Sequence, residues 1–96
     1  SFDSCVFRNI DFSNITLEDV NLIDCKFYNC DLSNKVFNEK ALSRVEFNNC
    51  KLIGVSFIDA SIRDVIISES NASLINFSGS KIINFRIIFK RKCIKS

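Results

Sequence analysis

The side chains able to do chemistry in this 96-residue chain are carboxylates, thiols and amines, because the sequence contains no histidine. Eleven acidic residues raise the question of acid–base catalysis, and five cysteines raise that of a metal site. No nucleophile stands beside a base at motif spacing, however, and there is no Gly-rich phosphate loop. A zinc site of the usual spacing is not expected without histidine. The sequence therefore predicts no enzyme, no catalytic residue, no metal site and no cofactor.

The carboxylates follow a fixed interval, which explains them better than catalysis does. Acidic, amide and glycine residues stand two positions after a large apolar residue, as Asp59 and Asp64 do, and these types suit a left-handed turn. Small or β-branched residues stand two positions before it. The apolar centres are five apart: Phe2, Phe7, Phe12, Leu17, Leu22, Phe27, Leu32, Phe37, Leu42, Phe47, Leu52, Phe57, Ile62, Ile67, Ala72, Phe77, Ile82 and Ile87. A period of five fits neither a helix nor a strand and indicates a repeat array.

The repeat resembles that of the pentapeptide-repeat family, whose motif is a small residue, Asp or Asn, Leu or Phe, Ser, Thr or Arg, and any residue. Residues 25–34, for example, read Cys-Lys-Phe-Tyr-Asn and Cys-Asp-Leu-Ser-Asn. The resemblance implies an all-β fold, a right-handed quadrilateral parallel β-helix of just under five coils with four pentapeptides to a coil. We expect residues 1–96 to form one domain, a fragment of a longer array, with residues 81–96 as an atypical terminal coil.

With four pentapeptides to a coil, residues twenty apart should stack in columns, as identical side chains do in cross-β assemblies. Like residues do recur at this interval. The predicted core columns contain Phe7, Phe27, Phe47, Phe37, Phe57, Phe77, Leu32, Leu52, Cys25, Cys30 and Cys50. Four of the five cysteines occupy inward positions, so they act as small hydrophobic residues rather than as disulfide partners. A reduced, cytoplasmic setting fits this use of cysteine. No apolar run approaches the ~20 residues that cross a bilayer, so no membrane segment is expected.

One corner of the predicted rod carries only acidic residues. Asp19, Glu39 and Asp59 stack there, with Glu18 adjacent. The row either binds a partner, or it only reflects the residue types that suit a left-handed corner, with solvation making the repulsion between the carboxylates tolerable. The sequence leaves both interpretations open.

Two lysines break the repeat, since Lys35 and Lys40 occupy successive inward positions, where an unpaired ammonium is costly. We expect a local bulge that carries both amines to solvent, with Lys40 beside Glu39, Val36 facing outward and the frame resuming at Leu42. Such a bulge is a second candidate surface for a partner.

The last coil carries surplus apolar groups. Phe85 looks too bulky for a small inward position, and Ile88 and Phe89 stand at outward sites. Either following residues or the same end of a second copy would cover them, and we expect a two-fold homodimer through Phe85, Ile88 and Phe89. Beyond them, Lys90, Arg91 and Lys92 form a single basic cluster without interleaved aromatic residues, so direct nucleic-acid binding is not expected.

The function most consistent with these features is a non-catalytic scaffold that presents the outward columns of a rigid rod to a protein partner. The alternative comes from the resemblance. Quinolone-resistance and self-immunity members of the family are understood to mimic DNA and bind type II topoisomerases such as DNA gyrase. A DNA mimic needs dense negative charge, whereas residues 1–80 hold seven basic against eleven acidic residues. Topoisomerase binding, with quinolone or toxin protection, is therefore the second hypothesis.

Overall fold

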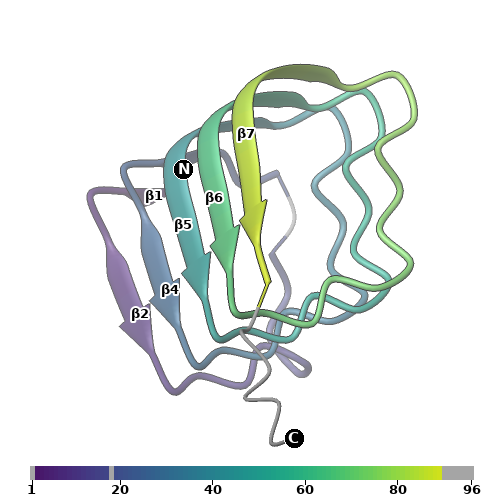
Figure 1. Ribbon diagram of the computed structural model, residues 1–96. Coiled ribbons are helices and arrows are strands. Elements are labelled where there is room, and N and C mark those ends of the chain that lie inside the picture. Colours follow the sequence, from purple (N-terminus) through teal and green to yellow (C-terminus); the bar gives the residue numbers. More distant parts are fainter. Residues whose placement is uncertain (1, 18, 90–96) are drawn as a thin grey trace, which may run out of the picture.

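A computed structural model describes residues 2–17 and 19–89, which form a solenoid of parallel strands without a helix. In Figure 1 the strands lie side by side along the solenoid, from β2 at one end to β7 at the other. No helix in the described residues is long and apolar enough to cross a membrane. The strands are β1 (Phe2–Asp3), β2 (Val6–Arg8), β3 (Leu22–Ile23), β4 (Lys26–Tyr28), β5 (Ala41–Asn48), β6 (Ser61–Ser68) and β7 (Lys81–Ile88).

The register repeats every twenty residues, because each strand residue pairs in parallel with the residue twenty positions later. Phe7 pairs with Phe27, and Phe27 pairs with Phe47. A coil is therefore twenty residues long, and we number the coils from residues 1–20 onward. The strands lie on the first two sides of each coil, and β5, β6 and β7 each turn a corner to cover both. The fold is thus the predicted all-β quadrilateral β-helix.

Short bridges replace strands on the other two sides. The third side is joined by the bridges Asp11–Asp31, Asp31–Lys51 and Lys51–Asn71. The fourth side is joined by Val36–Ser56 and Ser56–Asn76. Among the described residues, the bridges of the fourth side thus begin only at the second coil.

Stacked phenylalanine rings fill the core of the solenoid. The rings of Phe27 and Phe47 lie 5.1 Å apart with an interplanar angle of 15°, and the rings of Phe37 and Phe57 lie 5.5 Å apart at 14°. The predicted core residues are buried, with the exceptions of Phe7 and Phe77, which are half-buried. Each of these two rings stacks on a ring of its own column on one side only, Phe7 on Phe27 and Phe77 on Phe57.

The corners have the left-handed backbone that their residue types predict. Every position two after a centre, from Ser4 to Asn84, has a positive φ, with the exception of Asn14. Two of these corner residues are unsuited to that conformation. Arg44 has a φ of 54° and Leu74 has a φ of 60°, although left-handed backbone disfavours side chains that cannot bond their own turn. Leu74 is also 84% exposed.

Candidate functional site

The thiols in the core face inward and are held there by backbone carbonyls. Cys30 Sγ donates to the carbonyl of Tyr28 at 3.4 Å, and Cys50 Sγ donates to that of Asn48 at 3.4 Å. Burial raises the pKa of Cys25, and it raises the pKa of Cys50 to about 11. These thiols stay protonated at neutral pH, so neither is an activated nucleophile.

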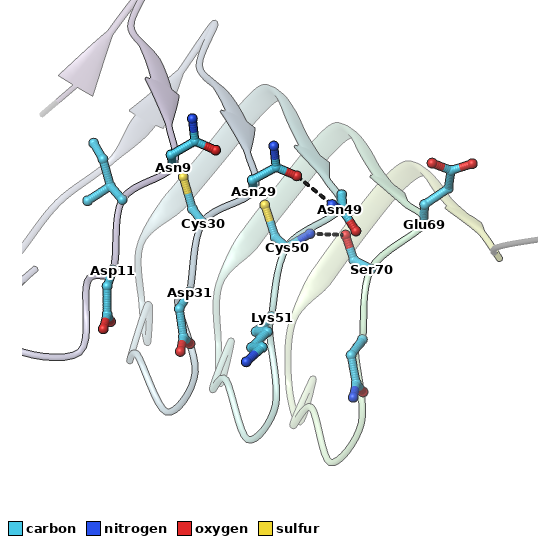
Figure 2. Close-up of a pocket in the computed structure, with 12 residues that line it drawn as sticks. Asn9, Asp11, Asn29, Cys30, Asp31, Asn49, Cys50, Lys51, Glu69 and Ser70 are labelled. Carbon is cyan, nitrogen blue, oxygen red and sulfur yellow. Dashed lines mark hydrogen bonds between the residues drawn. The ribbon is translucent and has the colours of Figure 1, made fainter.

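A groove of about 690 Å³ runs along the corner between the second and third sides. Figure 2 shows Asn9, Asn29, Asn49 and Glu69 following one another on one edge of this groove. A second row, drawn on the other side of the turn, contains Asp11, Asp31 and Lys51. Asn71, twenty residues after Lys51, also lines the groove. Both rows are polar and cross four successive coils.

Local hydrogen bonds fix the side chains of the groove. Asn49 Nδ2 donates to Asn29 Oδ1, so these two amides are linked along the corner. The backbone N–H of Ser33 donates to Asp31 Oδ1 at 3.0 Å, and that of Ser13 donates to Asp11 Oδ1 at 2.9 Å. Ser13 also lowers the pKa of Asp11 below its ordinary value. The groove therefore holds oriented carboxylate and amide groups, which suits recognition by hydrogen bonds rather than chemistry.

On the neighbouring corner, opposite charges alternate and satisfy one another. Arg44 binds both carboxylate oxygens of Asp24, with Nη2 at 3.0 Å from Oδ2, and this contact lowers the pKa of Asp24. Asn84 Nδ2 donates to Asp64 Oδ1 at 2.6 Å. On the second side, Lys26 Nζ lies 3.6 Å from Glu46 Oε2. These exposed pairs contribute little stability and leave few charges free for a partner.

The acidic corner is confirmed as a set of left-handed turns, but it is not uniformly negative. Asp19, Glu39 and Asp59 are exposed with φ between 54° and 61°. Asp19 accepts an ion pair from Lys40, whose Nζ lies 2.9 Å from Oδ1, and this contact lowers the pKa of Asp19. The predicted neighbour Glu18 lies outside the described residues.

The expected bulge at Lys35 and Lys40 is wrong. Ser56 N–H donates to the carbonyl of Lys35 at 3.0 Å, and Ser61 N–H donates to that of Lys40 at 2.9 Å, so the lysine backbone keeps the regular register. Val36 does face outward. Lys40 pairs with Asp19 of the coil before it rather than with Glu39.

The irregularity lies instead between the first and second coils, on the fourth side. Within the described residues, no backbone hydrogen bond joins residues 14–17 or 19–20 to residues 34–41. We call this boundary the open seam. Lys35 Nζ donates to the carbonyl of Ile15 at 2.6 Å, and Ala41 N–H donates to the side chain of Asn21 at 2.9 Å. The amines leave the core through this seam because an unpaired buried ammonium is costly.

The C-terminal end of the described rod keeps its backbone register while exposing apolar groups. β7 pairs with β6 from Lys81 to Ile88, so this part of the predicted atypical coil is regular. Phe85 was expected to be too bulky, yet it is half-buried and packs edge-on against Phe77 at 5.6 Å. Ile88 and Phe89 are exposed. The basic cluster Lys90–Lys92 lies outside the described residues.

No group of three or more Cys, Asp or Glu side chains in the described part of the chain is placed to hold a metal ion. Sequence reasoning missed the polar groove and the open seam. The groove had a readable signal, since Asn9, Asn29 and Asn49 stand twenty apart. The seam had a weaker one, because the sequence does not say through which side the two lysine amines leave the core.

Comparison with known proteins agrees with this architecture. Residues 1–77 match the family described as a pentapeptide repeat region, and the chain belongs to that family. Among solved structures it is similar to a pentapeptide repeat protein, Rfr23, from the cyanobacterium Cyanothece 51142. The two chains are 9% identical with a TM-score of 0.36, over 92% of this chain and 86% of that one. No curated protein matches.

Proposed function

We propose that this protein is a non-catalytic scaffold whose rigid rod presents outward columns to a partner protein. The observation that carries the proposal is the groove, where two polar rows cross four coils while the core depends on neither row. One row places carboxylates at Asp11 and Asp31 next to an amine at Lys51, at roughly 4.8 Å per coil. Such a pattern of charge gives specificity more than affinity.

The alternative proposal is a DNA mimic that binds type II topoisomerase. Glu39 and Asp59, exposed on successive coils, support it. Against it stand the pairings of Asp19 with Lys40, of Asp24 with Arg44 and of Glu46 with Lys26, because a polyanion mimic needs unpaired negative charge.

The test is a pull-down from cell lysate with the whole chain as bait, and it compares the parent with two double variants of residues outside the core. Asp31→Lys with Lys51→Asp reverses the groove row, and Glu39→Asn with Asp59→Asn neutralises the acidic corner. A partner kept by the parent and by the corner variant, but lost by the groove variant, supports the scaffold hypothesis. Recovery of gyrase that DNA competes away, with loss in the corner variant, supports the alternative. If the two variants retain the same proteins as the parent, both proposals are wrong.

We also propose that this chain pairs with a second copy through its exposed C-terminal apolar groups. Ile88 and Phe89 supply the contact, Phe89 being 79% exposed, and half-buried Phe85 adds its exposed part. Exposed apolar clusters of this kind mark interaction sites. Sedimentation of the parent against an Ile88→Asp and Phe89→Asp variant tests this. A parent that stays monomeric at high concentration and physiological salt rules the dimer out.

A further inference from the structure

The open seam leaves a backbone edge at Val36 of the second coil, which bridges to Ser56 on its other side and which no described backbone bond joins to the first coil. At the next boundary on the same side, Ser56 N–H donates to the carbonyl of Lys35, and Phe37 N–H donates to the carbonyl of Ser56 at 2.8 Å. The equivalent acceptor for Val36 N–H is the carbonyl of Ile15, which binds Lys35 Nζ instead. Unpaired strand edges are sites where another extended chain adds.

The groups that the lysines now hold indicate what this edge binds. Lys35 Nζ takes a backbone carbonyl from Ile15, and Lys40 Nζ takes a carboxylate from Asp19, four residues further along. Both groups come from the fourth side of the first coil, which carries an acid at its corner. Two ammonium groups beside a strand edge are complementary to a peptide with carboxylates at that spacing.

Only side-chain contacts hold the described part of the first coil's fourth side against this edge. Ile15 is 41% exposed, whereas Val55, two coils above it in the same column, is buried. The side chain of Asp19 is 90% exposed, and that of Lys40 is 26% exposed. Moving only residues 14–17 and 19–20 aside costs the two lysine contacts and the burial of Leu17 and part of Val20 but, within the described residues, no backbone bonds to the second coil on this side. The strands and the bridge on the other three sides of the first coil stay paired.

We propose that the open seam is a strand-addition site for an extended, acidic peptide segment of a partner protein. The segment pairs its backbone with that of Val36 and places two carboxylates on Lys35 and Lys40. It thereby replaces the carbonyl of Ile15 and the carboxylate of Asp19. This site lies on the fourth side, away from the corner groove, and does not depend on the function proposed for that groove.

The test uses a capped synthetic peptide, Thr-Asp-Val-Thr-Val-Asp-Thr, labelled with fluorescein, and a matched peptide in which Lys replaces both Asp residues. Binding to the whole protein is followed by fluorescence anisotropy, and protection of the Val36 amide is followed by hydrogen exchange. We expect the acidic peptide to bind, to weaken as salt screens the charges, and to slow exchange at Val36. Equal binding of the lysine peptide, or binding without protection of Val36, would overturn the proposal.

Two variants separate the seam from general charge. Lys35→Val with Lys40→Ala installs the residues found one coil later, Val55 and Ala60, so the protein should fold well while the site is lost. Arg63→Ser with Lys81→Ser removes two exposed positive charges elsewhere and installs the residues found one coil earlier, Ser43 and Ser61. We expect the seam variant to lose about tenfold or more in affinity, the scale of one charge-assisted contact, and the control to bind like the parent. Equal affinities in the two variants, or no binding to the parent at millimolar peptide, would rule the site out.

Discussion

Two boundaries between coils on the fourth side of this solenoid differ in their backbone pairing. Between the second and third coils, backbone bonds run from Ser56 to Lys35 and from Glu39 to Ile58, and the coils are joined. Between the first and second coils the described backbone makes no such bond, and lysine side chains cross the boundary instead. The same two lysines border both boundaries. Their amines leave the core toward the first coil only, and the boundary on that side is the open one. The direction in which a lysine amine leaves the core therefore decides which boundary opens.

The comparison shows what holds a pentapeptide solenoid together. Stacked centres are present at both boundaries, since Leu17 and Phe37 are buried on either side of the open seam. Burial of the centre is therefore not sufficient for backbone pairing. What differs is the inward residue two positions earlier, which is the charged Lys35 or Lys40 in the second coil, with its amine directed at the first coil, and the uncharged Val55 or Ala60 in the third.

The largest change in the free energy of unfolding should come from the third coil, whose backbone is paired. Phe47→Ala removes a ring that stacks on Phe27 and is fully buried in the third coil. Truncation of a buried Phe costs about 3–5 kcal/mol, and chemical denaturation would measure the loss in the free energy of unfolding. Phe7→Ala, in the half-buried end coil, is the control and should cost clearly less. Equal losses would mean that the end coil is as well packed as the middle.

Closing the open seam should have the next largest effect, and it should raise the free energy of unfolding. Lys35→Val with Lys40→Ala removes the charges that force the coils apart, so Val36 becomes free to pair with Ile15 as Ser56 pairs with Lys35. At about 0.5–1.5 kcal/mol for each hydrogen bond gained, we expect about 1–3 kcal/mol of added stability by denaturation. Destabilisation would show that the lysine contacts hold the first coil better than a backbone ladder does.

Much of this architecture could be predicted from the sequence, because the five-residue period and the twenty-residue stack can be read directly from which residue types recur. Phe27, Phe47 and the corner at Asn49 follow them without exception. The rules fail where a residue breaks the pattern. At Lys35 and Lys40 the sequence showed that the amines must leave the core, but their path depended on which neighbouring coil offered an acceptor. That information is carried by residues twenty positions away.

The candidate sites were predictable only in part, for a related reason. The acidic corner was visible as Asp19, Glu39 and Asp59, whereas the neutralisation of Asp19 by Lys40 was not, since Lys40 was expected beside Glu39. Similarly, Phe85 was expected to be too bulky for its inward position, but it is half-buried and its ring packs against that of Phe77 at an angle of 62°. The column in which a residue stacks predicts which residues can be its neighbours. The rotation of its side chain then decides which of them it contacts.

Leu74 offers a smaller test within a single corner column. It stands in left-handed backbone with a φ of 60°, where the coil before it has Gly54. Asparagine tolerates this conformation, so Leu74→Asn should raise the free energy of unfolding by about 1 kcal/mol. The change also removes an exposed apolar side chain. Gly54→Leu is the reverse control and should destabilise, because a Cβ there would collide with the side chain of Asn34. An unstable Leu74→Asn variant would mean that Leu74 makes a contact that compensates for its backbone.

The smallest expected effect is the pH dependence that the open seam contributes to stability. Lys40 lowers the pKa of Asp19 below its ordinary value, so the folded protein binds fewer protons there than the unfolded chain does. The contact therefore stabilises the fold at pH above the ordinary aspartate pKa, and this contribution is lost as the pH falls through the lowered one. Carboxyl NMR titration should give Asp19 a low midpoint that rises in Lys40→Ala, while Asp24, held by Arg44, keeps its own. An unchanged Asp19 midpoint in that variant would mean that the ion pair is not formed in solution, and that Lys40 reaches water rather than the first coil.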